Sequence, residues 1–197
     1  REMIDKTIFA VSSDESRYNL TGVFFTRKER EAEKMLRMVA TDGYRLSLID
    51  RPLKMEIEGL ENGILLPKKG LSELTRLLEE EGNQVWVKMK NNNFIVKKDP
   101  VVLIMRLLDA EFPDYQQVIP SQTKRFIRMK RSQILESLKR VSILSSEKTK
   151  GVKFHFAEGL LELSSYNPDF GEAKEEFSVD YKGEDLSVGF NYRFVLE

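Results

Sequence analysis

A supersecondary unit of about 60 residues that recurs three times constrains the fold of this chain more than any other feature. Each copy begins with an amphipathic helix and continues with about three strand-like runs, and the helices are expected to start near Arg1, Lys68 and Ser132. Each helix has one apolar face, and the strands mostly alternate apolar and polar residues. The repeat therefore predicts an α+β fold, with helices on one side of antiparallel sheets.

Apolar spacing and turn residues predict the individual elements. Helices are expected over 1–11, 68–80 and 132–144, and Gly82-Asn83 is expected to cap the second one. Asp42-Gly43 between two apolar runs predicts a hairpin, and Pro52 is expected to interrupt the strand pattern. The predicted strands cover 18–26, 35–50 on both sides of Asp42-Gly43, 64–66, 85–89, 94–96, 101–108, 125–129, 152–156, 160–164, 175–179 and 186–190.

The chain changes character around Pro120 to Thr123, which predicts two domains, residues 1–121 and 122–197. It begins at Arg1 without an initiator Met, and it ends in an apolar run without a terminator. We therefore expect a fragment of a longer protein.

Composition excludes several classes of site. There is no Cys, which excludes disulfides, thiolate zinc sites and cysteine nucleophiles. His155 is the single histidine and is expected to be a solvent-facing strand residue, because the sequence proposes no nucleophile and acid to accompany it. No glycine-rich phosphate loop occurs, and no apolar run approaches the roughly 18 residues of a membrane span. No enzyme, cofactor or metal ion is therefore expected.

Charge is balanced, since 32 Lys and Arg residues oppose 32 Asp and Glu residues. This balance excludes a uniformly basic coat but allows one basic face. On any one helix, the cations beside the apolar stripe would be ordinary solubilising residues. Because they recur on all three helices, they indicate a shared surface that holds a polyanion by phosphate contacts without reading bases. They are Arg1 and Lys6, then Lys68, Lys69 and Arg76, then Lys130, Arg131, Lys139 and Arg140.

Four short motifs resemble the signature of one family. They are Val-Ala-Thr-Asp-Gly-Tyr-Arg-Leu at 39–46, Glu-Phe-Pro-Asp-Tyr at 111–115 with Val-Ile-Pro at 118–120, Ile-Leu-Ser-Ser-Glu-Lys at 143–148 followed by Gly-Val at 151–152, and Gly-Phe-Asn at 189–191. Their order and spacing, over nearly the whole chain, are similar to those of the bacterial sliding clamp, the beta subunit of DNA polymerase III.

This resemblance implies the DNA-clamp fold, with three-domain protomers that dimerise head to tail into a ring around duplex DNA. Residues 1–121 would be the middle domain without its first strand, and 122–197 the first part of the third domain. The protein would be a non-catalytic processivity factor of the bacterial cytoplasm. Its partners would be double-stranded DNA without sequence preference, the catalytic subunit of DNA polymerase III, the clamp loader and other clamp-binding proteins, with no membrane.

The resemblance also implies three sets of site residues. A pocket for short partner peptides would be formed by Leu20, Thr41, Gly43, Tyr44, Arg45, Leu46, Pro113, Gln117, Val118, Asn191 and Phe194. DNA contacts would come first from Arg17, in the loop 14–18, and then from Lys68, Lys69, Arg76, Lys139 and Arg140. The dimer surface would include Ile143, Leu144, Glu172, Glu175 and Glu176.

This chain departs from the family pattern at three positions. Tyr44 replaces a common histidine, Gln117 a common basic residue, and Thr149 an aromatic residue of some members. The change at Gln117 is expected to weaken contact with an acidic peptide or DNA.

Two other classes of function remain open from the residues alone. One is an α+β protein-interaction domain that never meets DNA. The other is a carboxylate-dependent nuclease or hydrolase, which would show divalent-metal-dependent turnover that is lost when a specific Asp or Glu is changed. A peptide pocket that works without metal would favour the clamp.

Overall fold

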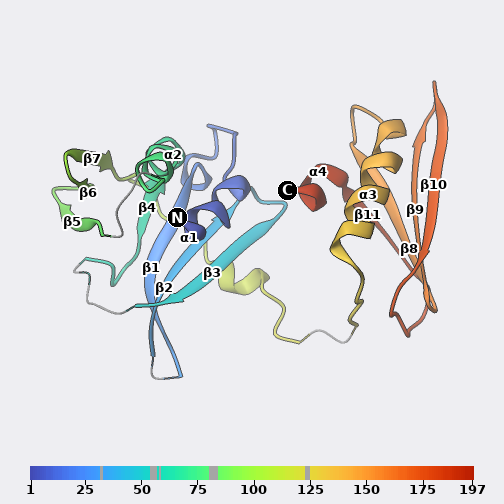
Figure 1. The fold of residues 1–197 in the computed structure, drawn as a ribbon, viewed down its shortest axis with the longest axis horizontal. Coiled ribbons are helices and arrows are strands. Elements are labelled where there is room, and N and C mark those ends of the chain that lie inside the picture. The colour runs from blue at the N-terminus through green and yellow to red at the C-terminus, as the bar shows by residue number, and fades with distance from the viewer. Residues whose placement is uncertain (32, 54–56, 58, 80–83, 123–124) are drawn as a thin grey trace. The chain divides into compact units, whose positions relative to one another are not determined.

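A computed structural model describes residues 1–31, 33–53, 57, 59–79, 84–122 and 125–197 (Figure 1). The chain forms two compact units, Arg1–Tyr115 and Gln116–Glu197, each described below by itself. The division lies a few residues before the expected boundary after residue 121. Among the described residues, no helix combines the length and the apolar character needed to cross a membrane.

The first unit is built around a four-stranded antiparallel sheet in the order β3-β2-β1-β4. Its strands are β1 (Gly22–Arg30), β2 (Glu33–Thr41), β3 (Leu46–Pro52) and β4 (Ile64–Pro67). The predicted hairpin at Asp42-Gly43 is confirmed, because β2 and β3 pair from Met35↔Pro52 to Thr41↔Leu46. Pro52 is the last residue of β3, so the strand ends where the sequence predicts an interruption.

Helix α2 (Lys68–Leu77) follows β4 directly and leads to a second sheet in the order β5-β6-β7. Its strands are β5 (Trp86–Lys90), β6 (Asn93–Lys98) and β7 (Val101–Arg106). Leu71, Leu74 and Leu77 are buried, as their helical spacing predicts. The helix ends at Leu77, with Leu78 as its C-cap, before the predicted end at residue 80. The expected cap Gly82-Asn83 lies outside the described residues.

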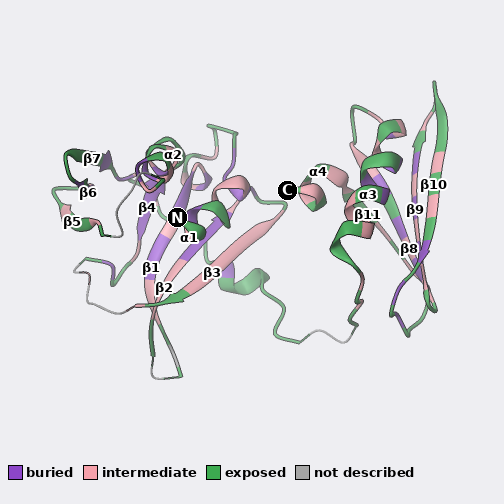
Figure 2. Cartoon of the chain, in the orientation of Figure 1, coloured by how far each residue is buried: buried purple, intermediate pink, exposed green. Residues whose placement is uncertain are grey.

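The core of the first unit joins both of its sheets and α2 (Figure 2). Val23, Leu66 and Leu71 are fully buried, and Phe94 and Met105 bring β6 and β7 into the same cluster. The buried amine of Lys98, on β6, donates a hydrogen bond to the Leu77 carbonyl at 3.0 Å. A cation therefore sits at the C-terminal end of α2, where it offsets the partial negative charge of the helix end.

The second unit contains α3 (Arg131–Val141) packed on a four-stranded antiparallel sheet in the order β10-β9-β8-β11. The strands are β8 (Gly151–Ala157), β9 (Leu160–Asn167), β10 (Gly171–Ser178) and β11 (Leu186–Asn191), and the short helix α4 (Tyr192–Leu196) ends the unit. Leu138, Leu161 and Leu163 are fully buried in its separate core.

The predicted threefold repeat is confirmed in its order. A helix precedes three consecutive strands in α1 (Glu2–Asp5) with β1–β3, in α2 with β5–β7, and in α3 with β8–β10. Two further strands, β4 and β11, complete the two larger sheets, and each leads directly into a helix.

Several predicted element bounds are wrong. The first helix stops at Asp5 because the Thr7 side chain bonds back to the Met3 carbonyl at 2.8 Å and its φ of −129° leaves the helical range. Residues 18–20 form a 3₁₀ turn, so β1 starts only at Gly22.

Two other strand predictions also need correction. Within 125–129, only Arg128 pairs, with Asp180, because the remaining residues find no ladder partner among those described. In β5, Trp86, Val87 and Lys88 are all exposed, so the alternation expected of the strands does not hold there.

Candidate functional site

The turn between β2 and β3 is held by the carboxylate of Asp42. One of its oxygens accepts hydrogen bonds from the backbone N–H groups of Tyr44 and Arg45 at 3.0 and 3.1 Å. The Thr41 hydroxyl donates to the Arg45 carbonyl at 2.6 Å and accepts from the Gly43 N–H at 3.0 Å. These bonds fix the backbone shape of residues 41–45. Asp42 was not among the predicted site residues, although Asp before Gly is the usual signal of such a turn.

The guanidinium of Arg45 stabilises this turn through contacts with Asp42 and Phe9. Its Nε donates to the other Asp42 oxygen at 3.0 Å, and a terminal nitrogen donates to the Phe9 carbonyl at 2.7 Å. The guanidinium also lies 5.3 Å from the centre of the Phe9 ring. Because the side chain is only 18% exposed, Arg45 acts as a positioning residue for the neighbouring backbone.

Arg17 joins the predicted DNA-contacting loop to the predicted peptide-binding turn. Its Nε donates to Asp14 at 3.1 Å, a terminal nitrogen donates to the Asp42 carbonyl at 2.7 Å, and the guanidinium lies 5.8 Å from the Tyr44 ring centre. Hydrogen bonds from Ser16, and then from Arg17, lower the pKa of Asp14. Two sites that the sequence treats separately therefore share one side chain.

Gly43 is required at the point of this contact. Its φ is +87°, and a Cβ at this position would lie 2.8 Å from the Arg17 guanidinium. A larger residue would therefore strain the turn and also displace Arg17.

The other predicted pocket residues of the first unit differ in exposure. Leu20 is buried at the end of its 3₁₀ turn, directly before β1, and Leu46 is half-buried at the start of β3. Tyr44 is 78% exposed, and Pro113 is exposed. The turn thus presents a ring and apolar edges to solvent on a fixed backbone.

Four predicted pocket residues belong to the second unit. Gln117 and Val118 are exposed in a 3₁₀ turn, and Phe194 is half-buried on α4. The Asn191 side chain accepts a hydrogen bond from the Arg193 N–H at 3.1 Å, so it caps α4. Their part in a common pocket stays a prediction.

The cations of α2, Lys68, Lys69 and Arg76, are exposed, whereas its leucines are buried. Arg76 pairs with Glu73 at 3.0 Å, on the same helix. Among the residues that the structure describes, Lys68 and Lys69 have no ion pair or side-chain hydrogen bond. They are the cations of α2 best able to contact phosphates.

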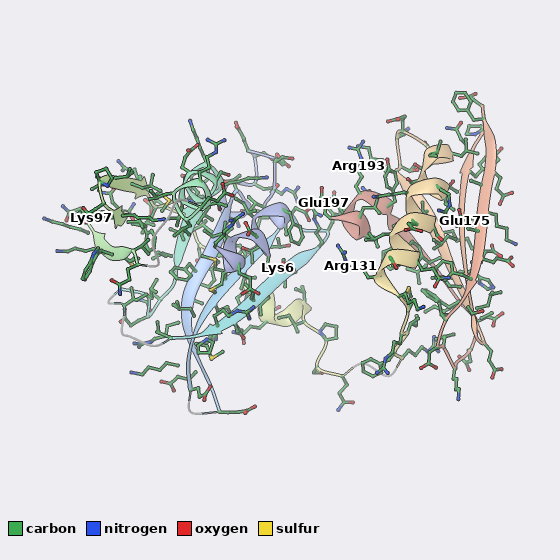
Figure 3. The ribbon with its side chains drawn as sticks, in the orientation of Figure 1. Lys6, Lys97, Arg131, Glu175, Arg193 and Glu197 are labelled. Atoms are coloured by element: carbon green, nitrogen blue, oxygen red, sulfur yellow. The ribbon has the colours of Figure 1, made fainter. Side chains whose placement is uncertain are left out.

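On α3 the structure joins two residues that the sequence assigns to different sites. Arg140, predicted for DNA, makes a two-pronged contact with Glu175 on β10, predicted for the dimer surface, at 2.5 and 2.8 Å. Figure 3 labels Glu175 beside α3. This contact lowers the pKa of Glu175 and raises that of Arg140. Lys139 is exposed, and no ion pair to another described residue engages it.

The remaining predicted dimer residues lie on or beside an open edge. β10 pairs with β9 alone among the described strands, and Glu172 and Glu176 are exposed on it. Lys174 lies 2.9 Å from Glu176, which lessens the negative charge of the edge. Ile143 is 78% exposed and Leu144 half-buried in the turn after α3.

His155 lies half-buried on the outer face of its sheet, 3.0 Å from the Ser187 hydroxyl. In the described part of the chain, no three side chains of the types that ligate metals gather together.

Comparisons with known proteins cover both units. Residues 1–114 match the family model of the DNA polymerase III beta subunit, central domain, and residues 116–197 match the model of its C-terminal domain. Beta sliding clamps of Caulobacter vibrioides and Escherichia coli are 34% and 32% identical over 195 and 197 residues. The chain spans about half the length of these relatives, 52% in each case, while 99% and 100% of this chain is covered.

Solved structures agree. The sliding clamp of Bartonella birtlesii bound to griselimycin has a TM-score of 0.93 and 35% identity, over 98% of this chain and 52% of that one. The DNA polymerase III beta subunit of Thermotoga maritima has a TM-score of 0.87 and 36% identity, over 99% of this chain and 52% of that one. The chain belongs to the family of DNA polymerase III beta subunits, of which it carries the central domain and C-terminal domain sequence.

Proposed function

We propose that this chain is part of a bacterial sliding clamp, a homodimeric ring that encircles duplex DNA and tethers the replicative polymerase, the clamp loader and other clamp-binding proteins. The consecutive match of the two units to the central and C-terminal domains of one family carries this proposal. The role is non-catalytic. Because the closed ring cannot leave the duplex, the polymerase stays on its template without strong binding to DNA. It places the chain in the bacterial cytoplasm, where the replicated DNA lies.

We further propose that the turn at residues 41–46 forms one wall of a peptide-binding pocket. Its backbone is fixed by Asp42 and supported by Arg45, so little ordering is needed when a peptide binds. A Leu or Phe side chain of the peptide contributes about 1.5–3 kcal/mol on full burial, before the cost of association. Such a pocket suits weak partners that exchange.

For DNA, the structure favours the exposed lysines of the helices over the residues that already have partners. Lys68 and Lys69 on α2 and Lys139 on α3 are the strongest candidates, since Arg17 and Arg140 are engaged by Asp14 and Glu175. Contacts between single lysines and phosphates are weak and independent of base sequence, as sliding requires.

The test of this function is a fluorescence polarisation titration of a short labelled peptide ending in Leu-Phe against the complete gene product in which this chain occurs. We expect saturable binding that is lost or weakened at least about tenfold by Leu46→Asp or Tyr44→Ala, which corresponds to about 1.4 kcal/mol. Tyr44 is exposed, so its truncation leaves the fold intact.

Phe170→Asp is the matched control, because Phe170 is an exposed aromatic residue outside the predicted pocket. Its binding curve should overlay that of the unchanged protein. If the folded, unchanged protein binds no peptide, the proposed function is wrong, and an α+β interaction domain that does not use this pocket becomes the better account.

A further inference from the structure

The outer face of the sheet β5-β6-β7 combines exposed apolar side chains with cations. Trp86 is 70% exposed, Ile104 61% and Val102 52%, although all three belong to regular strands. Large apolar side chains gathered on one face of a strand layer usually mark a contact surface. Trp86 is also the single tryptophan of the chain.

The strand register shows which side chains share this face. Directly opposed residues point to the same side of a sheet, and every second residue of a strand returns to that side. Three rows result, and together we call them the β5–β7 outer face: Trp86–Lys97–Val102, Lys88–Ile95–Ile104 and Lys90–Asn93–Arg106. The alternate residues, such as Phe94, Val96 and Met105, are buried in the core.

The charge of this face is entirely positive. Its ionisable members are Lys88, Lys90, Lys97 and Arg106, and none of the residues in the three rows is acidic. Asp99, in the turn after β6, lies 3.0 Å from the Lys97 amine, but both side chains are at least half exposed, so this ion pair contributes little. Figure 3 shows Lys97 directed away from the sheet into solvent. The face is therefore basic and apolar in a chain whose net charge is +0.

We propose that the β5–β7 outer face binds an acidic, amphipathic segment of a partner protein. Carboxylates of such a segment would pair with the lysines and Arg106, while its apolar side chains would cover Trp86, Ile95 and Ile104. This surface is separate from the turn at 41–46 and does not depend on the function proposed above.

The size and composition of the face favour a segment over other occupants. The three rows span about 10 Å across the strands and about 14 Å along them, the width of one peptide segment. A second copy of this face would oppose cations with cations. A DNA backbone offers phosphates to the cations but no apolar side chains to cover Ile104 and Val102. A bilayer is distinguished by the vesicle titration described below.

The experiment uses the fluorescence of Trp86 in the complete gene product, isolated as the difference from a Trp86→Phe variant. The probe is a short peptide in which glutamate alternates with leucine. We expect a saturable blue shift as the peptide covers the indole ring. The double change Lys88→Glu with Lys97→Glu should weaken binding at least tenfold, about 1.4 kcal/mol or more, and Ile104→Ser should weaken it less.

Lys153→Glu with Lys182→Glu is the matched control, because it makes the same change of charge at exposed lysines of the second unit. It should leave the titration unchanged, and circular dichroism melting should show that every variant folds. The proposal is overturned by the absence of a saturable shift. Equal binding of a peptide with lysine in place of glutamate overturns it as well, as does a shift produced by phosphatidylserine vesicles or duplex DNA but not by the acidic peptide.

Discussion

At the scale of single residues, Lys174 organises the charges on the outer face of the second sheet. Its amine lies 2.7 Å from Glu162 and 2.9 Å from Glu176, on two neighbouring strands. The hydrogen bond from Lys174 is the largest cause of the lowered pKa of Glu162, and the charges of Lys174, His155 and Lys153 add to it. The ordinary value of this carboxyl group is 4.5.

We expect Lys174→Gln to raise the pKa of Glu162 towards its ordinary value, because the strongest stabiliser of the carboxylate is removed. A carboxyl group whose pKa is lowered by folding stabilises the fold at pH values above its pKa in the unfolded chain. This contribution is lost as the pH falls through its pKa in the folded protein. The variant should therefore lose less stability than the unchanged protein on acidification below pH 4.5.

A ¹³C NMR titration of the Glu162 carboxyl carbon measures this shift. Lys182→Gln is the control, since Lys182 is exposed and lies outside this group of charges. Identical titration curves for Lys174→Gln and the unchanged protein would contradict the assignment.

At the scale of elements, one ion pair fastens the hairpin that carries the candidate site. Arg37 on β2 and Asp50 on β3 are directly opposed and join through two hydrogen bonds of 2.7 Å. A further bond of 3.3 Å runs from Arg37 to the Tyr115 hydroxyl. The Arg37 and Asp50 side chains are 18% and 14% exposed, so solvent screens this pair much less than a surface pair.

Asp50→Ala should lower the free energy of unfolding by about 1–3 kcal/mol, because it leaves the guanidinium of Arg37 partly buried without its counter-ion. Urea denaturation followed by circular dichroism measures the change. The matched control is Glu73→Ala, which breaks the exposed pair with Arg76 and should cost at most about 0.5 kcal/mol. Equal losses in the two variants would show that burial does not strengthen the pair on the hairpin.

At the scale of the whole molecule, the chain uses one order of elements in each unit. In both, a helix precedes three strands, and a fourth strand joins the sheet beside the first of these before a second helix follows. Each unit has its own core, with Leu66 fully buried in the first and Leu161 in the second. We therefore expect the two units to unfold independently.

We expect Leu66→Ala and Leu161→Ala each to lower the free energy of unfolding of its own unit by about 2–5 kcal/mol. In differential scanning calorimetry of the chain, each change should lower the midpoint temperature of a different transition. The reason is that each cavity forms in only one of the two cores. A single transition that both changes lower equally would contradict this independence.

Features that depend on local spacing could be predicted from the residues alone. The leucines of α2, the Asp42-Gly43 hairpin and the order of helix and strands follow from periodicity and turn chemistry over a few residues. Four short motifs, in the same order and at similar spacing, together indicated the family. Ends of elements were less predictable, because a single side chain such as Thr7 redirects the backbone.

Which of the predicted charged residues form ion pairs could be seen only once the chain was folded. Arg140 and Glu175 are far apart in the sequence but meet when α3 packs on the sheet, and Arg17 donates a hydrogen bond to the Asp42 carbonyl, 25 residues away in the chain. The basic and apolar face of β5–β7 likewise exists only because the strand register places those residues in rows. Charge pairing depends on distances of a few ångströms between segments that are remote in the chain. The spacing of residues along the sequence carries no information about these distances.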